Sequence, residues 1–289
     1  MKVAITGASG LIGSALTTHL GATGHHVVGL RRPLDWDPEG GAMSTEALRG
    51  IDALVHLAGV GIAESRWTAA QKEAIRRSRV EGTSLVARTL AAMNDGPRVF
   101  ISASGIGFYG DHGDDIIDES TPVGHDFLAE VAQEWEAATA PAAAAGVRVV
   151  LARSGQVLSA GGGSLAKQLP FFRLGLGGRV GSGRQWVSWI TIDDEVAAIE
   201  WLLRSDVSGP VNLVSPNPVR NAEFAATLGR LLHRPTFVIP MIGPRLLYGR
   251  ELADSLLLTS QRVAPTALVE RGFEFRTPTL DEALSHLLR

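Results

Sequence analysis

The chain begins with a short apolar strand that runs directly into a glycine-rich turn and then into a helix. Residues 2–13 read Lys-Val-Ala-Ile-Thr-Gly-Ala-Ser-Gly-Leu-Ile-Gly, with glycines in G-x-x-G-x-x-G spacing. Gly7 permits a tight turn, Gly10 lets a pyrophosphate approach the backbone, and Gly13 lets the helix pack closely on the strand. The phosphates would lie on free N–H groups at the helix N-terminus, so we expect a dinucleotide site; a turn without a ligand is the alternative. The residues expected to bind the cofactor here are Gly7, Ser9, Gly10, Leu11, Ile12 and Gly13.

Composition excludes several classes of protein. The 289 residues are 45% hydrophobic and carry a formal net charge of −3, which indicates a globular chain without overall attraction to nucleic acid or an anionic membrane. There is no cysteine, which excludes disulfides and thiolate chemistry, and no pattern predicts a metal site. The glycine turn starts at residue 7, and no uncharged apolar run reaches membrane-spanning length. We therefore expect a cytoplasmic protein with no membrane or nucleic-acid partner.

Strand-like runs alternate with helix-period segments through the first half of the chain. We expect strands at 2–6, 26–30, 53–57, 98–102 and 147–152, with helices near 11–20, 68–92 and 126–145. This alternation predicts an α/β fold with a Rossmann-type, doubly wound parallel sheet. Later segments predict helices at 192–203, 222–232 and after Thr279, and strands at 211–214 and 236–239. We expect a dinucleotide-binding domain at 1–150 and a smaller α/β substrate lobe at 151–289, some of whose segments rejoin the first sheet.

The end of the second expected strand indicates which dinucleotide is bound. In NAD-binding proteins of this type an acidic residue there takes the ribose hydroxyls, whereas an arginine suits a 2′-phosphate. Here the strand ends in Arg31-Arg32, and no acid follows until Asp35. Two guanidiniums would attract the additional phosphate and stack on adenine, so we predict NADP(H). Two solvated surface arginines are the alternative.

The third expected strand ends in His56-Leu57-Ala58-Gly59. Small residues at this point let the backbone pass close to the cofactor, which predicts a contact by Leu57, Ala58 and Gly59. The alternative is a buried strand that merely ends in glycine, with His56 as a core histidine.

These motifs resemble the extended short-chain dehydrogenase/reductase superfamily, and more narrowly its atypical epimerase branch, some members of which carry the name cell-division inhibitor. The similarity covers nearly the whole chain and includes the opening loop, Ile101-Ser102-Ala103-Ser104 and Phe108-Tyr109-Gly110. The branch-specific segments are Arg153-Ser154-Gly155, 170–178, 181–185, 189–194, Val214-Ser215-Pro216 and 221–225. The resemblance implies an NADP(H)-dependent epimerase, dehydratase or reductase (an oxidoreductase or isomerase), with Ser102, Arg79 and Glu73 near the cofactor.

The chain lacks the acid/base pair that the resemblance would lead one to expect. Members of the superfamily use Tyr-x-x-x-Lys, in which the lysine lowers the tyrosine pKa, together with a serine that orients the substrate. Neither tyrosine is followed four residues later by lysine, and the corresponding stretch 126–136 has Phe or Leu and Val or Ala at the two positions. Ser104 stands within one residue of the family serine. Ser104 and Tyr109 are therefore the candidate catalytic residues, although Tyr109 can equally be part of a structural turn.

Charge is segregated along the middle of the chain. Residues 99–147 contain no lysine or arginine, whereas 137–192 contain no acid. The second stretch is rich in glycine and arginine and carries Trp186 and Trp189, which suits a flat anion such as a nucleotide diphosphate. In extended relatives this half binds the nucleotide-sugar substrate. The expected substrate-binding residues are Arg153, Arg173, Arg184 and Trp189. Alternatively, the two stretches pair with each other.

Two functions remain open at this stage. The first is an NADP(H)-dependent enzyme that acts on a nucleotide-sugar-like anion without the Tyr-x-x-x-Lys pair. The second is a catalytically impaired NADP(H)-binding scaffold or redox-sensing regulator, for which the name carried by some branch members suggests a role in cell division. The sequence identifies neither the substrate nor the proton carrier, and a homodimer is only the common default for soluble oligomers.

Overall fold

A six-stranded parallel sheet forms the centre of the molecule in the computed structural model, which describes residues 1–289. Its strand order is β13-β8-β6-β5-β1-β2, and every neighbouring pair is parallel. The strands are β1 (Lys2–Thr6), β2 (His26–Leu30), β5 (Ala53–His56), β6 (Val99–Gly105), β8 (Arg148–Ser154) and β13 (Gly209–Leu213). The predicted doubly wound parallel sheet is confirmed, and the division proposed near residue 150 falls within β8.

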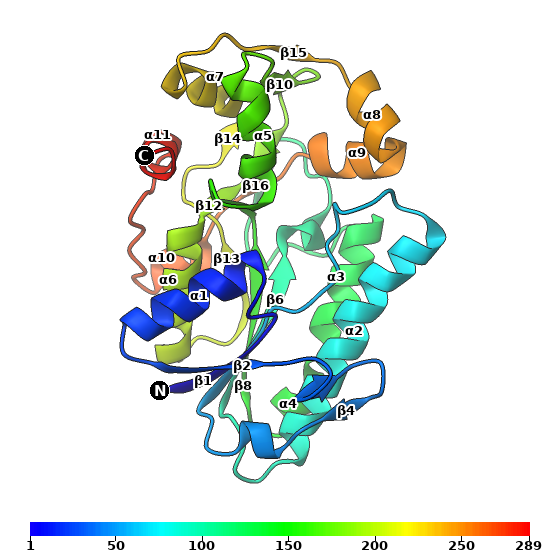
Figure 1. Ribbon diagram of the computed structural model, residues 1–289, viewed down its shortest axis with the longest axis vertical. Helices are drawn as coiled ribbons and strands as arrows, with labels where there is room; N and C mark the ends of the chain where they lie inside the picture. The colour runs from blue at the N-terminus through cyan, green and yellow to red at the C-terminus, as the bar shows by residue number, and fades with distance from the viewer.

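Two layers of helices cover the sheet (Figure 1). One face carries α1 (Leu11–Ala22), α6 (Ile192–Arg204) and α10 (Thr266–Glu270), and the other carries α2 (Ala69–Ala92), α3 (Phe127–Ala137) and α4 (Ala140–Ala144). Alternate residues of each strand point to opposite faces, so Val3 and Ile5 pack under α1 and α6 while Ala4 packs towards α2. Burial on both faces explains the nearly continuous apolar strands. The helix expected at 126–145 is divided into α3 and α4 near Thr139.

The later part of the chain builds a lobe over the carboxyl ends of the strands. It has its own core, to which α5 (Gly163–Arg173), α7 (Asn221–Leu231) and α11 (Leu280–Leu287) contribute, and its pairs of short strands are parallel except for β11 with β14. The remaining elements of the lobe are β9 (Gln156–Leu158), β10 (Gly178–Val180), β11 (Trp186–Val187), β12 (Trp189–Thr191), β14 (Val219–Arg220), β15 (Phe237–Ile239), α8 (Ile242–Tyr248), α9 (Arg250–Leu257) and β16 (Arg262–Val263). Short elements in the first part are β3 (Trp36–Asp37), β4 (Ala42–Met43), β7 (Ile116–Ile117) and the 3₁₀ turns Glu46–Leu48 and Ile106–Tyr109.

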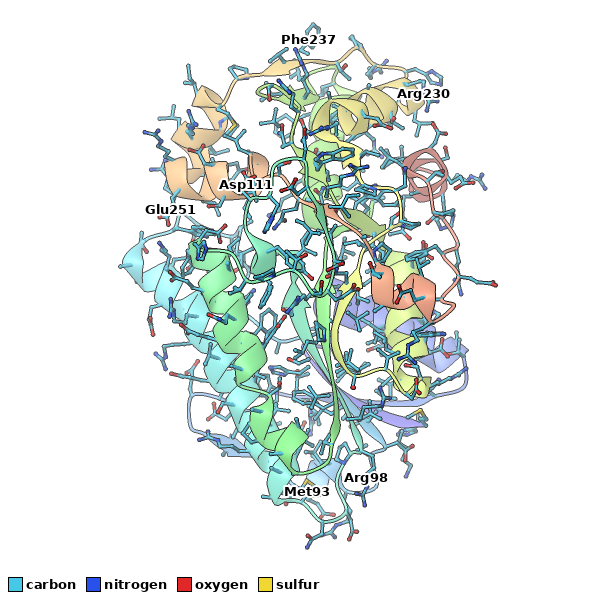
Figure 2. The ribbon with its side chains drawn as sticks, turned by 180° about the vertical axis from the view of Figure 1, so that it is seen from behind. Met93, Arg98, Asp111, Arg230, Phe237 and Glu251 are labelled. Carbon is cyan, nitrogen blue, oxygen red and sulfur yellow. The ribbon has the colours of Figure 1, made fainter.

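Specific contacts hold the lobe against the sheet domain. Strand β16 pairs with β7, and Lys72 of α2 forms an ion pair with Glu251 of α9 at 2.6 Å. Figure 2 shows Glu251 beside the N-terminal end of α2, with Met93 and Arg98 at the opposite end of the molecule from Phe237. The lobe therefore covers the carboxyl edge of the sheet, where ligands of doubly wound folds bind. No helix combines the length and the apolar character needed to cross a membrane.

Candidate functional site

The glycine turn brings three chain segments closer together than any side chain would permit. Gly7 has φ +70°, and a Cβ there would lie 2.8 Å from the Ala58 nitrogen. A Cβ on Gly13 would lie 2.1 Å from the Gly7 oxygen, so this position cannot carry a larger residue without displacing α1. Gly10 caps the helix without a side-chain hydrogen bond. The first-turn N–H groups of α1 therefore face the end of β1 unshielded, as an anion-binding helix terminus requires.

A cleft of about 870 Å³ runs from this turn along the carboxyl edge of the sheet. It is half-open and is lined from β1, β2, β5 and α2, which are distant in sequence but adjacent in the fold. The residues predicted from sequence that line it are Gly7, Ser9, Gly10, Arg32, Leu57, Ala58, Gly59 and Glu73. Those that do not line it are Leu11, Ile12, Gly13, Arg31, Arg79 and Ser102.

The two neighbouring arginines have different surroundings. Arg31 donates from Nε to Asp35 at 3.0 Å, its side chain is 70% exposed, and this hydrogen bond holds the pKa of Asp35 below its usual value. Arg32 lines the cleft, lies 5.6 Å from the Trp36 ring centroid and donates to Glu39 at 3.1 Å. Of these two arginines, only Arg32 is therefore placed to meet a phosphate in the cleft.

The floor of the cleft is neutral. His56 is fully buried at the end of β5, with Nδ1 2.6 Å from the Thr6 hydroxyl and Nε2 without a partner. Burial lowers the pKa of His56 to about 4, so the ring is uncharged at neutral pH. Trp36 packs edge-on against it at 5.5 Å. His56 is thus a core residue that supports the cleft from below.

Arg79 supports the wall of the cleft from behind. Its guanidinium donates to the carbonyl oxygens of Val60 at 2.9 Å and Ile75 at 3.2 Å, and lies 5.1 Å from the Trp135 ring centroid. Burial lowers its pKa to about 10, which leaves it charged at neutral pH. Arg79 therefore fixes the backbone that follows Gly59, whereas exposed Glu73 stands at the rim.

The positions where the resemblance would put Tyr and Lys are apolar in α3. Val131 and Ala132 are buried, and Leu128 packs against the Gly107 position. Lys72 approaches from α2, with its ammonium 4.5 Å from the Phe127 ring centroid. Its ion pair with Glu251 directs it towards α9. The family positions of α3 therefore carry no proton carrier.

A buried polar network occupies the ends of β6 and β8. Glu136 accepts hydrogen bonds from Ser104 Oγ at 2.7 Å and from two nitrogens of Arg153 at 2.8 and 2.7 Å. Arg153 also donates to the Tyr109 hydroxyl at 2.9 Å, which in turn donates to Asn212 Oδ1 at 2.7 Å. The network thus joins β6, β8, α3 and β13 and satisfies the polar groups it buries.

Two residues predicted from the sequence to serve catalysis or substrate binding lie in this network. Tyr109 is 1% exposed, and burial raises its pKa, so its hydroxyl is protonated at neutral pH and faces the network. Arg153 is 4% exposed, and Glu136 compensates its charge. At this point the acidic and basic stretches do pair with each other, which was the alternative considered from the sequence.

Trp189, which the sequence predicts to contact the substrate, lies inside the lobe. It is completely buried in the core of the lobe and donates from Nε1 to the Asn217 carbonyl at 2.9 Å. All three residues of β12 are buried, so neither face of this strand reaches the surface. Arg173 and Arg184 are exposed and form no ion pair.

An arginine–tryptophan cluster that sequence reasoning did not assemble lies on the lobe. The guanidiniums of Arg220 and Arg262 lie 4.2 and 4.6 Å from the Trp186 ring centroid. Arg220 pairs with Asp114 at 2.7 Å, and this pair, together with Trp186, lowers the pKa of the Asp114 carboxyl. Gln261 donates to the carbonyls of Ile106 and Gly110, which ties the cluster to the segment after β6. Trp186 was visible in the basic stretch, but its arginine partners come from positions much later in the chain.

The parallel sheet, the glycine turn at the first crossover and the cleft at the carboxyl edge define a Rossmann-type dinucleotide-binding protein with an added lobe, the architecture of extended short-chain dehydrogenases. The chain belongs to the NAD-dependent epimerase/dehydratase family, whose profile matches residues 3–214. Residues 239–287 match a domain of unknown function, DUF1731. The predicted family resemblance is confirmed.

Individual relatives are similar over the full length of the chain. Epimerase family protein MT2273 of Mycobacterium tuberculosis is 45% identical over 98% of this chain and 96% of its own. Human epimerase family protein SDR39U1, solved with NADPH, is 33% identical with a TM-score of 0.91 over 99% of both chains. A nucleoside-diphosphate sugar epimerase of Corynebacterium glutamicum is 39% identical with a TM-score of 0.80, over 100% of this chain and 58% of that one.

Proposed function

We propose that this protein binds NADP(H) in the cleft and acts on an anionic, nucleotide-sugar-like substrate held between the sheet and the lobe. The observation that carries the proposal is the joint presence of an unshielded helix terminus at Gly10 and a cleft-facing guanidinium at Arg32. These two features fit the pyrophosphate and the 2′-phosphate respectively. The NADPH of the similar human structure supports the same cofactor.

Some residues of the cleft would bind the cofactor, and others would leave room for it. Gly7 and Gly10 would hold the pyrophosphate, Arg32 the 2′-phosphate, and Ala58 and Gly59 would let the chain of the cofactor pass. When bound, the nicotinamide supplies hydride transfer. With Arg32 at its adenine end beside β2, the cofactor would extend along the strand order towards β6 and β8.

The substrate anion would bind at the arginine–tryptophan cluster of Trp186, Arg220 and Arg262. Two guanidiniums, 4.2 and 4.6 Å from the Trp186 ring centroid, present positive charge and N–H donors to a nucleotide diphosphate. Exposed Arg184 extends this surface. The nucleoside-diphosphate sugar epimerase among the similar structures supports this substrate class.

One observation favours a second candidate, an NADP(H)-binding scaffold without turnover. Ser104 is engaged with Glu136, Tyr109 is buried, and α3 carries no proton carrier at the family positions. The two candidates make opposite predictions for the same sample.

The test loads the protein with NADPH or NADP⁺, adds a panel of nucleotide sugars, and follows nicotinamide absorbance together with product analysis. The enzyme proposal expects a changed sugar with at least one substrate, and loss of its binding in the Arg220→Ala/Arg262→Ala double variant. Arg271→Ala, a remote exposed arginine, is the matched control. Tight NADPH binding without turnover on any nucleotide sugar would favour the scaffold, and failure to bind NADPH would contradict both.

A further inference from the structure

A buried carboxyl group with one unpartnered oxygen lies beside the carboxyl end of β8. Glu195 in the first turns of α6 is 1% exposed, and its Oε1 accepts a hydrogen bond from Ser154 Oγ at 2.6 Å. Its Oε2 has no hydrogen-bond partner. Burial raises the pKa of Glu195 to about 7, against the opposing effect of the Ser154 hydrogen bond. Such a group exchanges its proton near neutral pH.

Its location follows from the strands around it. Ser154 ends β8, is only half-buried, and pairs with Gly105 at the end of β6. The chain then passes through β9 to Gly162 and Gly163, where an added Cβ would lie 2.8 and 3.1 Å from Leu11 at the start of α1. Ser154 therefore lies at the carboxyl end of β8, on the side of the sheet that faces α1. Glu195 is in direct hydrogen-bond contact with it.

The sheet order connects this point to the cofactor. The cleft begins at Arg32 after β2, and the order β2-β1-β5-β6-β8 puts Ser154 four strand spacings away, about 19 Å. A dinucleotide whose adenine end lies at Arg32 and whose pyrophosphate lies on α1 extends along this edge towards β6 and β8. Its nicotinamide end is thus the part that meets Ser154.

No positive side chain compensates Glu195. On its own helix, Asp193 points to His286, and Asp194 accepts hydrogen bonds from the backbone of Arg276 and from Thr277. On β8, Arg153 is held by Glu136. The parts of α1 and β9 packed nearby are apolar: Ile12, Ala15 and Val157. The one positive charge that can enter is therefore on the ligand, and a nicotinamide ring carries it only when oxidised.

We propose that Glu195 couples a proton to the oxidation state of the bound nicotinamide. It stays protonated beside NADPH and becomes a carboxylate beside NADP⁺. For the proton to leave, the Ser154 hydroxyl turns from donating to Oε1 to accepting from a proton on that oxygen. It takes up this proton as it releases its own to water, and no electron moves in this step. The inference rests on the proposed cofactor and its orientation, and it gives Glu195 and Ser154 a positioning role that favours the oxidised form.

Titration calorimetry of NADP⁺ and of NADPH, each in two buffers of different protonation enthalpy, measures the protons released on binding. At pH 6.5 we expect the wild type to release more than half a proton per NADP⁺ beyond the value for NADPH. At pH values below the pKa of Glu195, each rise of one pH unit should lower the Kd for NADP⁺ by up to about tenfold relative to the Kd for NADPH. Proton exchange at the 2′-phosphate is common to both cofactors and cancels in the difference.

Variants separate Glu195 from other groups. Glu195→Gln should abolish the difference in proton release and still bind NADPH, whereas Asp193→Asn, an exposed acid in the same turn, should behave as wild type. Ser154→Ala, which removes the hydrogen bond that lowers the pKa, should shift the release to higher pH and provides a second variant if Glu195→Gln does not fold.

Equal proton release for the two cofactors, or a difference that persists in Glu195→Gln, would overturn the inference while leaving the proposed function intact. A wild type that binds neither cofactor would overturn both.

Discussion

Replacing Glu195 by glutamine should change how the stability of the protein depends on pH. Burial raises the pKa of Glu195 from 4.5 to about 7. Between these values the native state keeps a proton that the unfolded state has lost, so the free energy of unfolding falls as pH rises. At about 1.4 kcal/mol per pKa unit, the full difference is about 3 kcal/mol. Most of it, about 2.5 kcal/mol, should be lost between pH 5 and pH 8.

Urea unfolding followed by circular dichroism at pH 5, 6, 7 and 8 provides the assay. Because glutamine cannot ionise, the stability of Glu195→Gln relative to wild type should rise by about 2.5 kcal/mol over this range. Any constant cost of burying the amide cancels in the comparison. Glu223→Gln should keep the wild-type slope, since Glu223 in the first turn of α7 is exposed and forms no ion pair. Parallel stability curves for wild type and Glu195→Gln would refute the buried, protonated carboxyl.

Three further predictions concern positions whose roles the structure defines. Gly13→Ala should lower stability by about 1–3 kcal/mol and abolish NADPH binding because its Cβ would meet the Gly7 oxygen, whereas Gly21→Ala in the same helix has open space and should be neutral or stabilising; calorimetry and melting temperature check both. Glu136→Gln should cost about 3–5 kcal/mol in urea unfolding by leaving the guanidinium of the buried pair uncompensated, and an unchanged midpoint would contradict the pairing. Tyr109→Phe should cost about 1–3 kcal/mol without changing the Kd for NADPH, and a large loss of affinity would mean that Tyr109 contacts the cofactor after all.

The local pattern of the sequence was sufficient to predict the sheet domain. The strand at 2–6 and the one at 26–30 match β1 and β2 residue for residue, because apolar runs between glycine turns allow no other arrangement in a parallel sheet. The turn at Gly7 was equally predictable from its glycine spacing. The prediction of one helix over 126–145 overlooks Pro141, which cannot continue the hydrogen bonds of α3 and instead stands in the first turn of α4.

The candidate site was only partly predictable, because its chemistry depends on residues that are distant in the chain. Arg153 stands in a stretch rich in arginine and glycine, which predicts anion binding. In the fold, however, its charge is compensated by Glu136 of α3. Trp186 and Trp189 stand in the same basic, glycine-rich stretch, and nothing local distinguishes them. In the fold, Trp189 on β12 is buried in the core of the lobe, whereas Trp186 lies beside the guanidinium of Arg220. Glu195 gives no signal in a helix start rich in acids until the fold buries it.

The measurement that tests the account most directly is the affinity of the protein for NADPH and NADH, in wild type, Arg32→Ala and Arg31→Ala. Loss of a charge-assisted contact worth about 1.5–3 kcal/mol corresponds to about 10- to 100-fold in Kd. We predict that wild type prefers NADPH, that Arg32→Ala loses this preference with little change for NADH, and that Arg31→Ala retains it because Arg31 does not line the cleft. Equal affinity of the wild type for NADPH and NADH would contradict the account.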